Sequence, residues 1–399
     1  MSTQLKTTTD MGTLVPSEEE LLERARALVP MLRERAEEVE RNRSVPKDIV
    51  DEFKKAGFFK ILQPRRWGGY EMAPITFLRV LMELGRGCCS SAWVMMILGI
   101  HQWEFGLMDP RAGDEVWGKD NTVLAASSYA TFGKAEKVDG GYRVSGTWRT
   151  SSGCDHGDWA FLGAYGHNDE GKIVDRMAFL VKATDYRIED DWHVFGLAGT
   201  GSKSLVVENA FVPDYRAHSI VDYRLSDRSE TYLHPFNMMF FGVVSAVIIG
   251  FGFQAIDVYT EQMKVRRNTD TGAPVAVSPY SRDRLANAVT KVRSAKLRLE
   301  GLFHDAARYV SNGELVPTDS RIRYMLDSAS VGQDVEEAVL LLYKVLGARG
   351  IFLSNPIQRV LRDTLAAANH ITQQADDHAA ALGGYLLGQG LPPMLYGLE

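Results

Sequence analysis

Hydrophobic and polar positions follow three successive patterns along this chain. In the first and last blocks, apolar residues recur every three or four positions, which is the period of amphipathic helices. Between them, residues 122–213 alternate apolar and polar positions and carry glycines at turn-like intervals, as short strands do. We therefore predict an α+β fold with a flexible tail (1–15), an N-terminal helical domain (16–120), a central β-barrel or sandwich domain (121–220) and a C-terminal helical domain (221–399).

The N-terminal block carries recognisable helix signals. Ser17 and Glu20 have the spacing of a capping box, so an amphipathic helix should begin there, with Pro30 as a point where it can break. A second helix should start at Pro46 and stop at Gly57. Two more are predicted over 75–85 and 90–108. The last is almost entirely apolar, which indicates a buried helix carrying the imidazole of His101.

Four long helices are predicted in the C-terminal block, and four antiparallel helices usually form a bundle. The first begins with the uncharged run 235–256, which is long enough to cross a bilayer. This run is single, contains Asn237, Ser245 and Gln254, and lacks a flanking basic cluster. We predict a helix buried on all sides and no membrane association. The expected helix ranges are 236–268, 281–312, 319–348 and 357–388.

Composition narrows the functional class. The formal net charge of −6 and the pI near 5.9 argue against nucleic-acid binding, which requires a basic face. The three cysteines, Cys88, Cys89 and Cys154, provide neither a disulfide framework nor a zinc ligand set, so no metal is expected. The N-terminus lacks the apolar core of a signal peptide. These features indicate a cytoplasmic protein.

One nucleotide-binding fingerprint occurs and is rejected. The run 249–255 contains G-x-G-x-x-A at Gly250, Gly252 and Ala255, but the fingerprint requires a strand before the first glycine and a second parallel strand after the helix. Here a long helical pattern surrounds the glycines and a loop follows. We predict that the glycines allow close helix packing and that the chain holds no nicotinamide site.

Polar residues in apolar or strand-like surroundings are the candidates for chemistry. The segment 146–159 packs small hydroxyls between two tryptophans, which favours a polar ligand. His101 and His370 each lie in a helical pattern, where a lone histidine is more often a satisfied core residue than a catalytic one. Ser151 and Ser152 have the same structural alternative. No Gly-x-Ser-x-Gly elbow and no H-E-x-x-H motif occurs, so a hydrolase or metalloprotease lacks support.

Several motifs together resemble a known family. The order of the three blocks, with WGG at 67–69, GLAGTGSKSLVVENAFVP at 196–213 and NPIQRVLRD at 355–363, resembles the acyl-CoA dehydrogenase fold superfamily over almost the whole chain. Within it, PRRWGG, ILGIHQW, ASSYA, SGTWRTSSGCDH and GLAGTGS resemble flavin-dependent two-component monooxygenases, the branch of the p-hydroxyphenylacetate and steroid phenol hydroxylases.

Departures from the dehydrogenases agree with that branch. Acyl-CoA dehydrogenases remove an α-proton with a glutamate, which in many of them follows the Arg-Asp segment. Here Arg362-Asp363 is followed by TLAAANHITQQ, with His370 at about that distance. The dehydrogenase-like flavin segment is likewise replaced by 146–152.

The resemblance implies roles for individual residues. The flavin-proximal serine of the family falls on Ser152, near flavin N5, and its C-terminal histidine on His370. Catalytic roles are thereby implied for His101, Ser152 and His370. Substrate contacts are implied for His101, Ser127, Trp148 and Phe240. Cofactor contacts are implied for Ser127, Ser128, Thr150, Ser151, Ser152, Thr200, Ser202 and Arg266, whose guanidinium suits a phosphate.

The resemblance also implies an activity. The implied activity is that of an oxygenase component that takes reduced flavin (FADH2 or FMNH2) from a separate NAD(P)H:flavin reductase. Such a component uses O2, through a C4a-hydroperoxide, to hydroxylate a small aromatic substrate that is phenolic or indole-like. A homotetramer is implied as well. An acyl-CoA dehydrogenase, an S- or N-oxygenating member of the same branch and a non-catalytic flavin-binding or helical scaffold protein are the alternatives.

Overall fold

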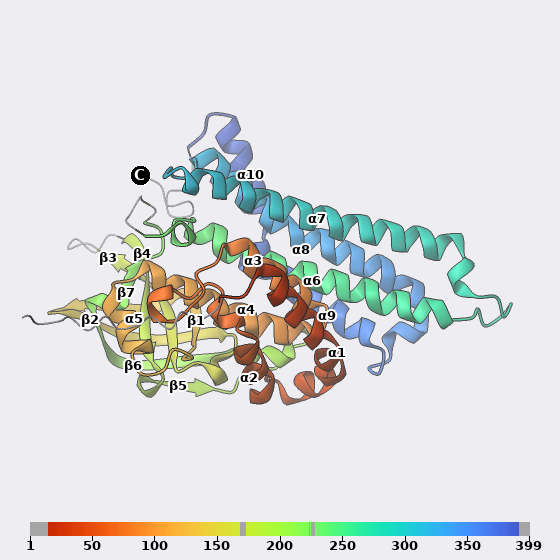
Figure 1. Cartoon of the computed structure of the whole chain (residues 1–399), viewed down its shortest axis with the longest axis horizontal. Helices are drawn as coiled ribbons and strands as arrows, with labels where there is room; N and C mark the ends of the chain where they lie inside the picture. Colours follow the sequence, from red (N-terminus) through yellow and green to blue (C-terminus); the bar gives the residue numbers. More distant parts are fainter. Residues whose placement is uncertain (1–14, 168–172, 223, 225–227, 391–399) are drawn as a thin grey trace, which may run out of the picture.

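The computed structural model describes residues 15–167, 173–222, 224 and 228–390, so the expected tail lies outside it except for Val15. Figure 1 shows a β-sheet at one end, the N-terminal helices packed beside it, and a long helical bundle that projects away from both. The α+β fold with these three components is confirmed.

Five helices precede the sheet. Ser17 caps the first with both hydrogen bonds of a capping box, and that helix continues through Pro30 without a break. Gly57 ends the second in the left-handed conformation (φ 82°), as predicted. The fourth is buried along all but one of its residues, including His101. These helices are α1 (Glu18–Asn42), α2 (Lys47–Ala56), α3 (Pro74–Gly85), α4 (Cys89–Glu104) and α5 (Pro110–Trp117).

Within the described residues, seven strands form one mixed sheet in the order β5-β6-β2-β1-β3-β4-β7. The first half of β1 pairs in parallel with β3 and its second half pairs antiparallel with β2, with a register shift between Ser128 and Gly133. This irregularity bends β1 and lies next to a cavity. The strands are β1 (Ala125–Val138), β2 (Gly141–Ser151), β3 (Trp159–His167), β4 (Ile173–Lys182), β5 (Tyr186–Glu189), β6 (Lys203–Pro213) and β7 (Ala217–Ser219).

The C-terminal block contains three long helices and two short ones. The prediction of one helix over 357–388 is wrong, because the chain leaves the helix at Asn369 and forms a short turn, η11 (Ile371–Gln373). Gln373 in that turn accepts a hydrogen bond from the amide of Gly332 and donates one to Ser245 Oγ. The helices are α6 (Phe236–Val265), α7 (Pro279–Ser311), α8 (Thr318–Leu346), α9 (Pro356–Ala368) and α10 (Ala375–Leu386).

The apolar helix α6 is the centre of the bundle. Among the described residues it is the one helix long and apolar enough to cross a membrane, and 78% of its most apolar window is buried inside the protein, as the sequence predicted. Gly250 and Gly252 lie within it. A Cβ at Gly250 would be 2.8 Å from Gly85 Cα, and one at Gly252 would be 2.7 Å from Val292 Cγ2. The glycines therefore serve helix packing, which confirms that the fingerprint is spurious.

Candidate active site

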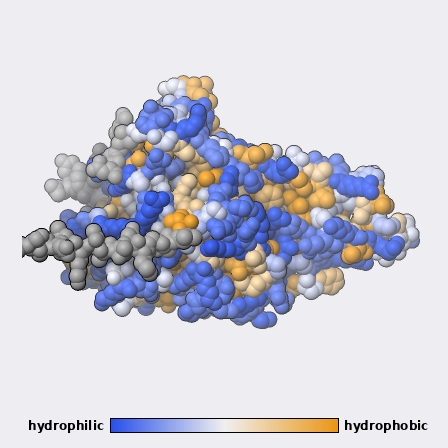
Figure 2. Space-filling model, in the orientation of Figure 1, coloured by the Kyte–Doolittle hydropathy of each residue, from blue (hydrophilic) through white to orange (hydrophobic). Residues whose placement is uncertain are grey.

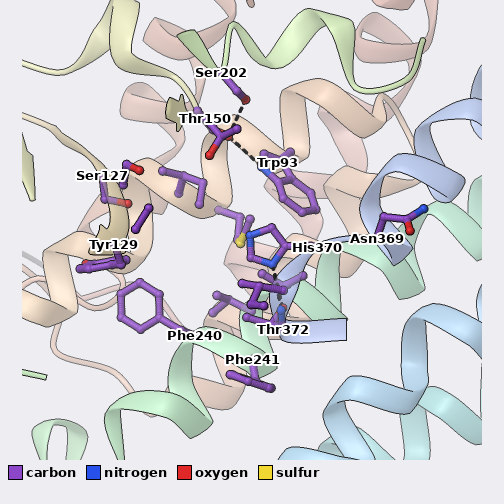
Figure 3. A pocket seen from close by; sticks show the side chains of 18 of the residues that line it. Trp93, Ser127, Tyr129, Thr150, Ser202, Phe240, Phe241, Asn369, His370 and Thr372 are labelled. Atoms are coloured by element: carbon purple, nitrogen blue, oxygen red, sulfur yellow. Dashed lines mark hydrogen bonds between the residues drawn. The ribbon is translucent and has the colours of Figure 1, made fainter. Parts of the chain in front are cut away.

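A cavity of about 1000 Å³ lies where the sheet, α4 and the C-terminal helices meet. Figure 3 shows Ser127, Tyr129 and Phe240 on one side of it and Trp93 and His370 on the other. Most of the predicted site residues are thus brought together from segments far apart in the sequence. Those that line the cavity are Ser127, Ser128, Thr150, Ser152, Thr200, Ser202, Phe240 and His370.

Four predicted site residues do not line it. Trp148 is fully buried within the sheet, where its Nε1 donates to Gly163 O at 2.7 Å. Ser151 is also fully buried, and its hydroxyl has no hydrogen-bond partner. Arg266 follows the far end of α6 and donates to Val345 O and Leu346 O. The sequence could not separate these residues from their neighbours, because strand alternation and helix length decide where each side chain lies.

His101 is the fourth predicted site residue that does not line the cavity. Its ring is fully buried and contacts Tyr129 and Phe240, which themselves line the cavity, at centroid distances of 6.0 and 5.8 Å. Its Nδ1 lies 2.8 Å from Glu104 Oε2, and its Nε2 has no hydrogen-bond partner among the described residues. His101 is therefore one layer of side chains behind the cavity, with one ring nitrogen unused.

Glu104 is the centre of a buried cluster behind that layer. Its carboxylate faces His101 Nδ1, the Tyr129 hydroxyl and His218 Nε2, the last at 2.8 Å. Burial alone would raise the pKa of Glu104, but the hydrogen bonds from His101 and His218 outweigh it and lower the pKa. Burial and the adjacent carboxylate raise the pKa of Tyr129 well above its usual range. His218 Nδ1 faces Ser219 O at 2.9 Å, so both of its ring nitrogens face acceptors.

A chain of hydrogen bonds runs along the opposite wall. Trp93 Nε1 donates to Ser152 Oγ at 3.1 Å, and Ser152 Oγ lies 2.6 Å from Ser202 Oγ. Ser202 Oγ lies 2.6 Å from Thr200 Oγ1, which donates to Leu197 O at 2.8 Å. All of these side chains are at least 90% buried. The wall is therefore a connected network.

Unusual backbone conformations bring these hydroxyls together. Thr150 has a φ of 61°, which a β-branched residue rarely adopts, at a register shift between β2 and β6. Gly153 then turns with a φ of 68°, and its amide donates to Thr200 O at 2.9 Å. The turn after β2 is thereby tied to the turn before β6. Strained residues of this kind cluster at functional sites.

Asp363 holds the second of these turns. Its Oδ1 accepts the Leu197 amide at 2.6 Å, across a sequence separation of 166 residues. Leu197 has a φ of 53°, and α9 packs so closely that a Cβ at Gly196 would lie 2.1 Å from Arg362 O. The Arg-Asp pair noted in the sequence therefore positions the 196–202 segment. Burial raises the pKa of Asp363 to about 6.

Asp363→Asn is expected to remove a pH-dependent loss of stability. The folded-state pKa of about 6 lies above the ordinary value of 3.8. Wild-type stability therefore falls as pH rises from about 4 to 6, by on the order of 3 kcal/mol, and the loss then persists. Asparagine can keep the Leu197 bond without the charge. Thermal unfolding at pH 4.5 and 7.5 should show that the stability of the variant, relative to wild type, is higher at pH 7.5 than at pH 4.5. A variant whose stability relative to wild type is lower at pH 7.5 than at pH 4.5 would contradict this account.

His370 reaches the cavity because of the break after α9. Its ring packs edge-on against Trp93, with centroids 5.5 Å apart. The Thr372 amide donates to its Nδ1, and Thr372 Oγ1 lies 2.9 Å from the same nitrogen. The hydrogen of the neutral ring therefore sits on Nε2. Burial lowers the pKa of His370 to about 4, so the ring stays neutral near pH 7 and is a weaker proton acceptor than an ordinary histidine.

Sequence reasoning missed Trp93, Glu104, Tyr129 and His218. The three-residue spacing of His101 and Glu104 on one helix is a signal that the two side chains can meet. Tyr129 lies two positions after Ser127, which places both on one face of a strand. No pattern marks Trp93 or His218, which depend on tertiary packing.

These residues fit a flavin. The cavity volume suits a tricyclic ring together with a small aromatic substrate. The wall of buried hydroxyls offers hydrogen-bond acceptors to the polar edge of such a ring, and α6 contributes the apolar side chains of Phe236, Phe240, Val243 and Val244. Ser152, Ser202 and Thr200 would hold the ring, with Trp93 and His370 beside it.

Comparisons with known proteins agree. Residues 16–106 match the N-terminal domain of acyl-CoA dehydrogenases, and residues 242–375 match their C-terminal domain. The flavin-dependent monooxygenase oxygenase subunit HsaA of Rhodococcus jostii is 35% identical over 93% of this chain and 98% of its own length. The FADH2-dependent resorcinol hydroxylase oxygenase component of a Rhizobium species is 31% identical, covering 92% and 94%. The structure of XiaF from a Streptomyces species, in complex with FADH2 and glycerol, matches with a TM-score of 0.87 at 25% identity, covering 95% and 98%.

The chain therefore belongs to the family of flavin-dependent monooxygenase oxygenase subunits, which share the acyl-CoA dehydrogenase fold. It is an oxygenase component that uses reduced flavin and O2 to hydroxylate an aromatic compound.

Proposed function

We propose that this oxygenase hydroxylates a phenolic or indole-like ring with reduced flavin supplied by a separate NAD(P)H:flavin reductase. The observation that carries the proposal is the division of the cavity into a wall of hydroxyls beside Trp93 and a wall of aromatic side chains around Tyr129 and Phe240. The first wall suits a flavin ring, and the second suits a flat apolar substrate.

One feature of the fold supports a separate reductase. The G-x-G-x-x-A run lies inside helix α6, where both glycines are packed against other helices. It cannot bind a nicotinamide nucleotide there. This supports the proposal that a separate protein supplies the reduced flavin.

Each group in the cavity has a role in this proposal. Reduced flavin, when bound, would supply the two electrons that activate O2, one of whose oxygen atoms enters the substrate while the other leaves as water. The apolar side chains of α6 exclude water, which would otherwise divert that reaction to peroxide. Ser127 and Phe240 contact the substrate. His370 donates a hydrogen bond through Nε2, because its Nδ1 is occupied by Thr372.

His101 is the proton acceptor for a phenol in this scheme. Its Nε2 is unpartnered, and Glu104 would stabilise the imidazolium formed when Nε2 accepts the phenol proton. The role requires Phe240 to move aside, since His101 lies behind it. Loss of the phenol proton raises electron density on the ring carbon that is attacked.

The carboxylates that line the cavity argue against a dehydrogenase. Acyl-CoA oxidation needs a carboxylate base facing the flavin. Among the described residues that line the cavity, Asp377 is the one carboxylate, and it is exposed on α10. The neutral ring of His370 stands where the sequence comparison places the dehydrogenase glutamate.

A reconstituted assay tests this function. The protein is mixed with an unrelated NADH:flavin reductase, flavin, O2 and a panel of phenols, indoles, sulfides and amines. Hydroxylated phenol or indole, formed only when both proteins are present, supports the proposal. Oxidation of sulfides or amines alone would assign the chain to the S- or N-oxygenating branch. Reduction of bound flavin by an acyl-CoA would contradict it.

We also propose that four copies of the chain assemble. Figure 2 shows apolar side chains breaking the hydrophilic surface over the helical bundle. Leu297 on α7 is 65% exposed, and Phe352 and Leu353 after α8 are 62% and 76% exposed. Exposed apolar side chains that gather into a patch mark protein–protein contact surfaces. The expected result of light scattering is the mass of four chains, and a stable, active monomer would contradict it.

A cytoplasmic location remains part of the proposal. Cys88, Cys89 and Cys154 are free and buried, which suits a reducing compartment.

A further inference from the structure

The hydrogen bonds of the hydroxyl wall have a fixed direction. A carbonyl can only accept, so the Thr200 hydroxyl donates its one hydrogen to Leu197 O. The 2.6 Å contact between Thr200 and Ser202 must then be donated by Ser202. By the same reasoning, the 2.6 Å contact between Ser202 and Ser152 must be donated by Ser152.

The other end of the chain agrees with this direction. The indole nitrogen of Trp93 can only donate, and it donates to Ser152 Oγ at 3.1 Å. Ser152 therefore receives one hydrogen from Trp93 and gives its own to Ser202. One lone pair of its oxygen remains for a ligand, and no hydrogen does.

Two neighbouring hydroxyls show the same property. Ser128 Oγ donates to Arg149 O at 2.7 Å, and Thr150 Oγ1 donates to the same oxygen at 2.7 Å. The hydroxyls of Ser128, Thr150, Ser152, Thr200 and Ser202 all line the cavity, and all have their hydrogens committed to protein oxygens. These five hydroxyls thus present lone pairs and no hydrogens to a bound ring.

Flavin changes its hydrogen-bonding character at one ring nitrogen when it is reduced. Oxidised flavin has a lone pair at N5 and so accepts there, whereas reduced flavin carries a hydrogen at N5 and donates. The family resemblance places Ser152 near N5. Because the Ser152 hydroxyl can only accept, it pairs with the reduced form and opposes the oxidised form, since two acceptors in contact leave both unsatisfied.

We propose that the directed chain from Trp93 through Ser152, Ser202 and Thr200 to the Leu197 carbonyl makes this site selective for reduced over oxidised flavin. The inference rests on the proposed function and goes beyond it by naming Thr200 and the Leu197 carbonyl as the groups that set the selectivity. In setting this selectivity both act through Ser152, as positioning groups, although Thr200 also lines the cavity.

The selectivity has a use in the proposed reaction. Oxidised flavin formed at the end of each turnover would meet a wall of acceptors and dissociate, which frees the site for the next reduced molecule. Because reductase and oxygenase are separate in this proposal, the two flavin forms compete for one site.

Thr200→Val is the direct test, because valine has nearly the same shape and cannot accept from Ser202. The hydrogen of Ser202 then has Ser152 Oγ, 2.6 Å away, as its nearest acceptor in the chain. If Ser202 donates there, Ser152 must turn its own hydrogen toward the cavity. The variant should bind oxidised flavin more tightly and reduced flavin more weakly.

The measurement is the ratio of the dissociation constants for oxidised and reduced flavin, determined by anaerobic titration without substrate. We expect wild type to favour reduced flavin and Thr200→Val to lower that ratio about tenfold, the effect of one hydrogen bond. The same change appears as a fall of about 30 mV in the potential of bound flavin, since a tenfold ratio is 29.6 mV for two electrons.

Trp93→Phe is the matched control. It removes a different hydrogen bond from the same Ser152 oxygen but leaves the Ser152 hydrogen committed to Ser202. Affinity for both flavin forms should change together, so the ratio should stay near that of wild type. Circular dichroism and thermal unfolding of both variants confirm that each is folded.

The outcomes separate this inference from the proposed function. An unchanged ratio in Thr200→Val, with both forms still bound, overturns the directed chain and leaves the oxygenase intact. Equal affinity of wild type for the two forms also overturns it. Failure of wild type to bind flavin in either state would instead overturn the flavin site itself.

Discussion

Replacing His370 by alanine is expected to lower product formation by about 10² to 10³, the typical cost of losing one preorganised hydrogen-bond donor. The ring is neutral, with its hydrogen on Nε2, because Thr372 occupies Nδ1 and burial lowers the pKa to about 4. The loss should therefore be the same at pH 6 and pH 8, since the titration lies below both. Initial rates with saturating reductase and substrate at the two pH values provide the measurement.

His234→Ala is the matched control for that result. His234 is also buried, with a pKa that burial lowers to about 4, but it packs against Phe303 and does not line the cavity. The control should lose thermal stability and keep its rate per folded enzyme. A His370→Ala variant that only unfolds more easily would make His370 a core residue. A loss confined to the higher pH would restore it as a proton acceptor.

Ser152→Ala is expected to uncouple the enzyme, so that NADH consumed by the reductase appears as H2O2 and not as product. The serine is the member of the hydroxyl chain that joins Trp93 to Ser202. One lost hydrogen bond of about 1.4 kcal/mol corresponds to a tenfold change, so the ratio of product to peroxide should fall about tenfold. Peroxide and product are measured together, with equal reduced flavin supplied.

Ser151→Ala is the control at the adjacent position. The Ser151 hydroxyl is fully buried without a partner and does not line the cavity, so its removal should leave coupling unchanged. Uncoupling in Ser151→Ala that equals that of Ser152→Ala would show that the turn as a whole, and not one hydroxyl, determines coupling.

Local signals in the sequence were sufficient for most of the fold. The capping box at Ser17, the stop at Gly57 and the alternation of 122–213 each depend on near neighbours, and each was predicted correctly. The break in the helix after α9 was not predicted. It depends on Gln373 bonding to Gly332 on α8 and Ser245 on α6, which are far away in the sequence. The same break carries His370 into the cavity.

The site was predictable only as far as motifs reach. SGTWRTSSGCDH and GLAGTGS placed Thr150, Ser152, Thr200 and Ser202 at the cavity, but the same motifs also included Trp148 and Ser151, which are fully buried and do not line it. A register shift between β2 and β6 decides which hydroxyls turn toward the cavity. The Glu104 cluster joins α4, β1 and β7, and no local pattern connects those three elements.

The central claim is that an oxygen atom from O2 enters an aromatic substrate at the expense of flavin reduced elsewhere. The direct measurement is mass spectrometry of the product formed under isotopically labelled O2, with a separately purified flavin reductase and NADH. The account predicts one labelled oxygen atom in the hydroxylated ring and no product when either protein or flavin is omitted. Product whose new oxygen comes from water, or turnover driven by an acyl-CoA without reductase, would contradict it.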